Sequence, residues 1–153
     1  MVLSHDEHQV SDPYDLARFV HAQEDDYDRA LAEIRSGRKQ SHWMWYIFPQ
    51  FAGLGFSSMS SRYAIQSLAE AKAFLAHPVL GPRLLACAEA VVSIDGRSAT
   101  DIFGSPDDMK LCSSATLFAC VSSPGSVFDR VLDKYYQGTR DDKTLRLLNL
   151  RSP

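Results

Sequence analysis

Several features that would identify a class of protein at once are missing from this sequence. The chain has 153 residues and three cysteines, with no Cys-x-x-Cys pair, so neither a disulfide framework nor a thiolate zinc site is indicated. No apolar run approaches the length of a transmembrane helix. The first residues contain neither a basic nor an apolar stretch and do not look like a signal peptide. Together these absences lead us to expect a soluble protein of the bacterial cytoplasm.

An excess of charge of one sign is also absent. The sequence holds 16 Lys and Arg against 19 Asp and Glu, for a formal net charge of −3. Such a balance gives no overall attraction to nucleic acid or to anionic lipid, and we expect neither nucleic acid nor a membrane as a partner. The compact basic cluster of Arg35, Arg38 and Lys39 is typical of a solvated helix end.

Sequence motifs for phosphate and metal are absent as well. Neither GxxxxGK[ST] nor GxGxxG occurs, and the scattered histidines His5, His8, His21 and His77 lack metal-ligand spacing. We therefore expect no metal and no cofactor. The cysteines lie among apolar residues, which favours packing as small hydrophobic side chains; they are Cys87, Cys112 and Cys120.

Composition and length fit one ordinary globular domain, with 45% hydrophobic and 23% charged residues. Residues 1–11 are polar and aperiodic, and we expect a flexible N-terminal tail there. Residues 12–150 are expected to form a single helical domain, while the oligomeric state stays open.

Helix start signals recur along this domain. They are Asp12-Pro13, Ser67 with Glu70, Ser98, Ser105-Pro106 with Asp107, and Ser126. Apolar residues at helical spacing follow these starts, predicting about eight helical pieces. The fold class is therefore mainly α, a compact multihelical single domain, with at most one or two short strands near Trp45–Phe48. Residues 51–61, rich in glycine and serine, are expected to be a loop.

The most unusual stretch is residues 41–50, SHWMWYIFPQ, where aromatic residues are densest. Aromatic faces stack planar rings at about 1–3 kcal/mol each, and the polar residues beside them could orient a ligand. A buried core segment is the alternative, since aromatic residues also dominate cores by area. The candidate ligand-binding residues here are His42, Trp43, Trp45 and Gln50, with Lys39 just before them.

A second candidate is the helix expected after Pro106. Ser and Thr compete with backbone hydrogen bonds in helix interiors, so Ser113, Ser114 and Thr116 conflict with helical propensity, and such conflicts concentrate at functional sites. Lys110 and Ser114 are one turn apart and share a face. We expect Asp108, Lys110, Ser113, Ser114 and Thr116 to contact a ligand.

A third polar set surrounds the helix that starts at Ser67. Arg62, Tyr63 and Lys72 are candidate ligand contacts. Glu70 has two interpretations: a capping residue that accepts backbone amides, or a catalytic general base.

Three blocks of the sequence resemble a known bacterial family. Residues 37–50 (GRKQSHWMWYIFPQ), 77–84 (HPVLGPRL) and 102–111 (IFGSPDDMKL) are similar to the family catalogued as domain of unknown function 1810, whose members are often labelled calpastatin. The resemblance covers nearly the whole chain and implies a mainly helical fold. Calpastatin inhibitors are disordered and repetitive, unlike this sequence, so we give that label no weight.

The family is in turn distantly similar to the multihelical YbiA-like group, which is associated with NAD and ADP-ribose metabolism and includes enzymes that cleave N-glycosidic bonds. This similarity implies a role for Glu70 as the catalytic carboxylate, with Lys72 nearby.

Three functions follow as hypotheses. The first is an N-glycosidase acting on an ADP-ribose- or nucleotide-like compound, in which a carboxylate stabilises an oxocarbenium-like transition state. The second is a non-catalytic binder of a nucleotide-type small molecule, and the third is a protein-interaction module. We call residues 41–50 the tryptophan segment and the helix expected after Pro106 the serine-bearing helix. The first two hypotheses require these two segments to meet at an open hollow.

Overall fold

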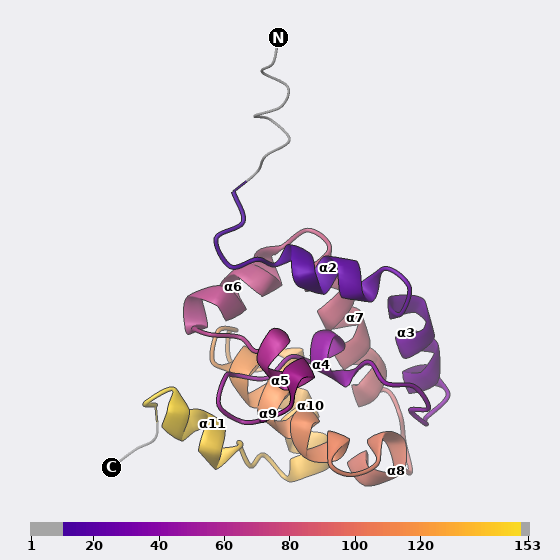
Figure 1. Cartoon of the computed structure of the whole chain (residues 1–153). Coiled ribbons are helices and arrows are strands. Elements are labelled where there is room, and N and C mark those ends of the chain that lie inside the picture. Colours follow the sequence, from indigo (N-terminus) through magenta and orange to yellow (C-terminus); the bar gives the residue numbers. More distant parts are fainter. Residues whose placement is uncertain (1–10, 151–153) are drawn as a thin grey trace.

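Residues 11–150 are described by a computed structural model, and they form helices joined by short loops (Figure 1). In chain order the helices are α2 (Ala17–Gln23), α3 (Tyr27–Arg35), α4 (Met44–Ile47), α5 (Ser58–Arg62), α6 (Leu68–Ala76), α7 (Leu80–Val92), α8 (Ala99–Phe103), α9 (Asp107–Ala119), α10 (Val127–Tyr136) and α11 (Asp142–Leu147). The prediction of a mainly helical fold is confirmed.

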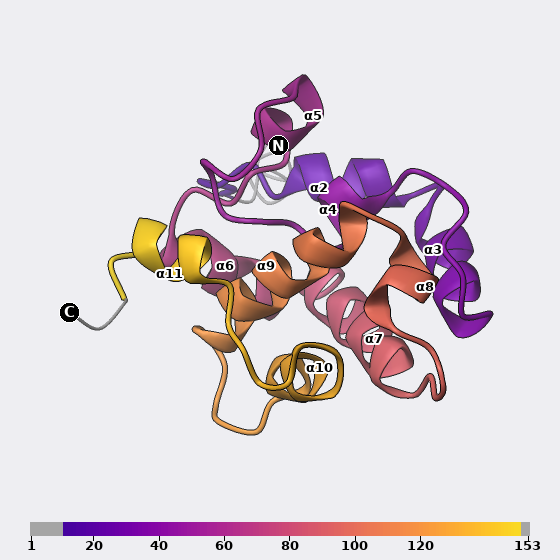
Figure 2. The same ribbon diagram turned by 90° about the horizontal axis from the view of Figure 1, so that it is seen from below.

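Helices α7 and α9 contact most of the other helices. Helix α9 contacts α6, α8, α10 and α11, while α7 contacts α3, α6 and α10. Figure 2 shows α9 between α10 on one side and α4 and α5 on the other. This central position of α9 explains why every residue from Ser113 to Phe118 is largely buried.

A row of buried aromatic rings runs through the core. Phe19 of α2 lies 5.0 Å from Phe74 of α6, Phe74 lies 5.4 Å from Phe118 of α9, and Phe118 lies 5.6 Å from Phe128 of α10. Each ring pair adds about 0.5–1.5 kcal/mol beyond the burial of its area. The row thus ties four helices into one hydrophobic cluster.

Serine caps begin several helices where the sequence predicted them. Ser67 Oγ accepts the Glu70 amide at 3.0 Å, Ser98 Oγ accepts the Asp101 amide at 3.0 Å, and Ser126 caps α10 in the same way. The reciprocal half of the expected box at Ser67 is displaced by one residue. Glu70 Oε1 accepts the amide of Gln66 at 2.8 Å.

The start of the domain differs from its prediction. Helix α2 begins at Ala17 instead of Pro13, because the chain first turns through Asp15, whose φ is 52°. Asp12 still caps this helix, since its carboxylate accepts the amides of Leu16 at 2.8 Å and Ala17 at 3.0 Å. The expected tail lies outside the described residues apart from Ser11.

Two short helices occur where the sequence indicated none. The sequence allowed at most one or two short strands near Trp45–Phe48, and none forms there, because Met44–Ile47 form α4. Helix α5 begins inside the expected loop, with Ser57 as its cap. Residues 11–150 contain no strand and only one isolated parallel bridge, between Phe51 and Ile65. The described chain therefore has ten helices instead of about eight.

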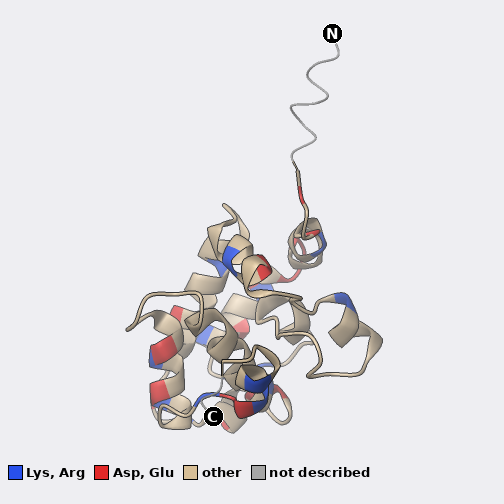
Figure 3. Cartoon of the chain, turned by 90° about the vertical axis from the view of Figure 1, so that its left-hand side faces the viewer, with Lys and Arg blue, Asp and Glu red and all other residues tan. Residues whose placement is uncertain are grey.

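The charged residues are dispersed. Figure 3 shows Lys and Arg positions interspersed with Asp and Glu along the helices. Within the described residues no single helix is both long and apolar enough to span a membrane, whereas α6 and α7 together, bent by 89° at their junction, pass on length and composition alone.

Candidate functional site

The tryptophan segment is held in place by Glu33, on the last turns of α3. The Glu33 carboxylate accepts the Trp43 indole N–H at 2.9 Å, the amides of Gln40 and Ser41 at 2.8 and 2.9 Å, and the Ser41 hydroxyl. Desolvation alone would raise the pKa of Glu33, but these hydrogen bonds outweigh it and lower the pKa to about 2. Sequence reasoning missed Glu33, which resembles any other acidic residue on a helix face.

Lysines connect this segment to α9. The Asp107 carboxylate lies 2.8 Å from Lys39 Nζ and 3.6 Å from Lys110 Nζ. The Lys39 ammonium lies 5.0 Å from the ring centre of Trp43, and the Lys110 ammonium lies 5.2 Å from that of Trp45. The two predicted segments therefore do meet, as the ligand hypotheses require.

The open hollow at this junction is a cleft of about 340 Å³ beside Lys110. Three parts of the chain surround it: the loop after α4, the first half of α9, and the start of α11. We call it the α9 cleft, and its lining residues are Gln50, Leu54, Gly55, Pro106, Met109, Lys110, Ser113, Asp141 and Lys143. Its size falls in the lower part of the range typical of small-molecule sites.

Three of the predicted ligand residues line this cleft, namely Gln50, Lys110 and Ser113. The Ser113 hydroxyl donates to the Met109 carbonyl at 3.2 Å. Asp108 lies on the side of α9 that contacts α8 and α10, where its carboxylate accepts the Thr100 hydroxyl at 2.6 Å and its carbonyl accepts the hydroxyl of Tyr136.

The remaining residues of the serine-bearing helix are interior. Ser114 is 1% exposed, and its hydroxyl has no hydrogen-bond partner among residues 11–150. Thr116 is fully buried and joins two elements, because its hydroxyl donates to the Cys112 carbonyl and accepts the Asp141 amide, both at 2.8 Å. Thr116 therefore positions the start of α11 beside the cleft.

The two tryptophans have different environments. Trp43 is 0% exposed and does not line the cleft. Trp45 is half-buried under Lys110, and its Nε1 is buried without a hydrogen-bond partner among residues 11–150. His42 is exposed, and its carbonyl accepts the Tyr46 hydroxyl at 3.2 Å.

Glu70 occupies a structural position away from the α9 cleft. Its side chain is 3% exposed, and its Oε2 lies 2.9 Å from the Arg18 guanidinium. Tyr63 is buried against Phe19 and Tyr46. Arg62 and Lys72 are exposed, and neither they nor Glu70 line the cleft.

Sequence reasoning did not select Met109 and Lys143, which line the cleft, or Phe56, which lies beside Lys143. Met109 is 65% exposed, and the ring of Phe56, 90% exposed, lies 5.9 Å from Lys143 Nζ. The face of this ring is open to solvent and is therefore available to stack on a planar group. No local pattern around Phe56 or Lys143 indicates that these two distant segments meet.

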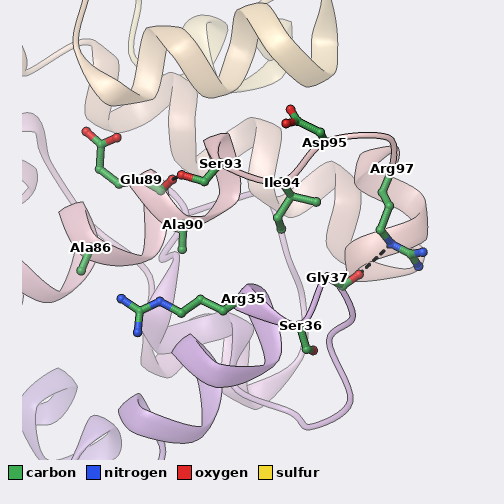
Figure 4. Close-up of a pocket in the computed structure, with 10 residues that line it drawn as sticks. All are labelled: Arg35, Ser36, Gly37, Ala86, Glu89, Ala90, Ser93, Ile94, Asp95 and Arg97. Carbon is green, nitrogen blue, oxygen red and sulfur yellow. Dashed lines mark hydrogen bonds between the residues drawn. The ribbon is translucent and has the colours of Figure 1, made fainter.

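Another hollow, of about 550 Å³, lies between the end of α3 and the second half of α7 (Figure 4). Its charged groups are mostly paired within the protein: Glu89 with Arg130, Asp95 with Lys134, and Arg97 with a backbone carbonyl. None of the predicted ligand residues lines it, so the α9 cleft is the stronger candidate.

The three cysteines differ in their burial. Burial raises the pKa of the Cys87 thiol to about 12 and that of Cys112 to about 11, so neither is a nucleophile at neutral pH. Cys120 is exposed, unlike the expected core packing, because it follows the last turn of α9.

Residues 11–150 contain no cluster of three His, Cys, Asp or Glu side chains able to hold a metal ion.

Comparisons with known proteins agree with this helical architecture. The crystal structure of a conserved hypothetical protein from Mycobacterium tuberculosis is similar, with 51% sequence identity and a TM-score of 0.89, over 92% of this chain and 100% of the other. No curated protein matches. Neither the calpastatin label nor the YbiA-like similarity gains support from these comparisons. The model of a family described as a protein of unknown function, DUF1810, matches residues 13–148, and the chain therefore belongs to this family.

Proposed function

We propose that the α9 cleft binds a small nucleotide-type anion without catalysing a reaction on it. The observation that carries this proposal is the combination of Lys110 and Lys143 in the cleft with the exposed Phe56 ring beside Lys143. Two ammonium groups suit a phosphate or diphosphate, and an exposed aromatic ring suits a base.

Lys110 has the capacity for this role. Its ion pair with Asp107 is long, at 3.6 Å, and Asp107 is closer to Lys39. A phosphate in the cleft could therefore take a hydrogen bond from Lys110 without breaking the Asp107–Lys39 pair.

The glycosidase hypothesis needs a carboxylate that is able to act on a bound ligand. Glu70 is paired with Arg18 outside the cleft. Asp141 lines the cleft, but its Oδ2 accepts the amide and the hydroxyl of Thr144 as the cap of α11. Binding without turnover therefore accounts for more of the geometry than hydrolysis does.

The test combines a binding and a turnover measurement. Titration calorimetry is expected to show that AMP, ADP and ADP-ribose bind. Inorganic phosphate and adenosine should bind with lower affinity than these nucleotides. Lys110→Gln and Lys143→Gln should each weaken ADP binding about tenfold, as loss of one charge-assisted hydrogen bond implies. Lys72→Gln, on the exposed side of α6, is the matched control and should leave binding unchanged.

Two results would reject the proposal. The first is equal ADP affinity in the wild type and in both cleft variants. The second is release of free base or sugar from ADP-ribosylated substrates by the wild-type protein, which would favour the glycosidase instead.

A further inference from the structure

A separate groove of about 570 Å³ lies between α2 and α6. Ala17 and Val20 of α2 form one wall and Ala73 of α6 forms the other, and Figure 1 shows these two helices next to each other. The volume and the apolar walls are those of an ordinary small-molecule pocket. None of its lining residues lines the α9 cleft.

His77, between α6 and α7, is one of the polar residues that line this groove, with Ser11, Asp12 and His21. Its Nδ1 accepts the amides of Val79 at 3.0 Å and Leu80 at 3.2 Å. A ring nitrogen that accepts two N–H groups carries no proton, so the single proton of the neutral ring is on Nε2. No acceptor among residues 11–150 bonds this Nε2–H. The amides at the start of α7 therefore leave the Nε2–H of His77 as the hydrogen-bond donor that this histidine offers to the groove.

The charge of the groove restricts the ligand further. Asp12 is the only carboxylate among its lining residues, and no lysine or arginine lines it. Both Asp12 oxygens accept amides at the start of α2. An anionic ligand would meet this negative charge without a fixed positive charge to offset it, whereas a neutral ligand would not.

We propose that this groove binds an uncharged molecule with an apolar body and one carbonyl oxygen. The body lies between Ala17, Val20 and Ala73, and the carbonyl oxygen accepts the Nε2–H of His77. This site is independent of the α9 cleft and of its proposed ligand.

The first test is an NMR titration of the isotopically labelled protein. Hexanamide and benzamide are the probes, and hexanoate and benzoate are their anionic counterparts. The amides should shift the resonances of Ala17, Val20, Ala73 and His77 and bind at least threefold more tightly than the carboxylates. Absence of shifts in the groove at millimolar probe, or equal affinity for amides and carboxylates, overturns the proposal. Shifts of the same resonances on dilution of the protein alone also overturn it, since a second copy would then occupy the groove.

Two substitutions separate the two nitrogens of His77. His77→Asn keeps an acceptor near the Nδ1 position but removes the Nε2 donor, so hexanamide should bind about 3- to 10-fold more weakly while the melting temperature changes little. His77→Gln keeps a donor near the Nε2 position but loses the cap, so affinity should stay within about threefold while the melting temperature falls.

Unchanged hexanamide affinity in His77→Asn would overturn the role of Nε2. Ala73→Leu fills the groove while keeping the His77 side chain, and it provides a readout that does not depend on the histidine variants folding. Hexanamide binding to Ala73→Leu as tight as to the wild type would overturn the location.

Discussion

The ammonium of Lys110 lies 5.2 Å from the ring centre of Trp45, and this contact joins the tryptophan segment to α9 at the edge of the cleft. A cation over an indole ring contributes about 0.5–2 kcal/mol, depending on its exposure. Lys110 is 22% exposed at its side chain, so it remains open to the cleft. The same lysine therefore supports the fold and faces the proposed ligand.

The indole nitrogens of the two tryptophans should differ sharply in their contribution to the free energy of unfolding. Trp43→Phe removes a hydrogen bond to the ionised Glu33 and should lower the free energy of unfolding by about 2–4 kcal/mol. Trp45→Phe removes a buried donor that has no partner among residues 11–150, and should cost about 1 kcal/mol or less. Urea unfolding of both variants measures this difference. Equal losses would contradict the assigned hydrogen bonds.

The pKa of Glu33 predicts how stability depends on acid. Its folded-state pKa of about 2 lies below the ordinary value of 4.5, so its contribution is fully present above about pH 4.5. This contribution is lost as the pH falls towards 2. Its size is roughly 1–3 kcal/mol after allowance for solvent screening.

Urea unfolding between pH 7 and pH 2 checks this prediction with Glu33→Gln as the comparison. The wild type should lose its advantage over the variant progressively below pH 4.5. A constant difference between the two proteins over the whole range would show that Glu33 titrates normally.

We expect Glu70 to stabilise the fold. Glu70→Gln breaks a nearly buried pair with Arg18 and should lower the free energy of unfolding by about 2–4 kcal/mol. The matched control is Glu89→Gln in the exposed pair with Arg130, for which about 0.5 kcal/mol or less is expected. Thermal unfolding and ADP titration of both variants are the measurements. A stable Glu70→Gln protein with altered ADP binding would instead favour the role predicted from the sequence.

We expect Phe56 to contribute to ADP binding and not to the stability of the fold. Its ring is 90% exposed, so Phe56→Ala should change the free energy of unfolding by about 0.5 kcal/mol or less. The same variant should weaken ADP binding about fivefold or more, as loss of a stacked ring implies, and leave phosphate binding unchanged. Leu150→Ala, another exposed apolar position, is the control. Calorimetry that finds equal ADP affinity in Phe56→Ala and the wild type would remove Phe56 from the site.

The sequence predicted the fold well where a helix is determined locally. The caps at Ser67, Ser98 and Ser126 were identified because side-chain-to-backbone bonds depend on residues only three positions apart. The short helix α4 was missed because four residues cannot stabilise a helix by themselves. Its conformation depends on contacts with α2, which no local pattern records.

The site was predicted in part for the same reason. Helical spacing placed Lys110 and Ser113 on α9, and both line the cleft. Ser114, only one position further, lies in the interior, since the buried face of α9 depends on the elements that surround it. Lys143 and Phe56 could not be selected, because their proximity requires α11 to return to the loop before α5.

A crystal structure of the protein grown with ADP would show whether the α9 cleft is the binding site. We expect the ligand in the cleft, with phosphate oxygens within hydrogen-bond distance of Lys110 and Lys143 Nζ and the base against the Phe56 ring. An empty cleft at saturating ADP, or ADP bound anywhere else on the molecule, would contradict this expectation.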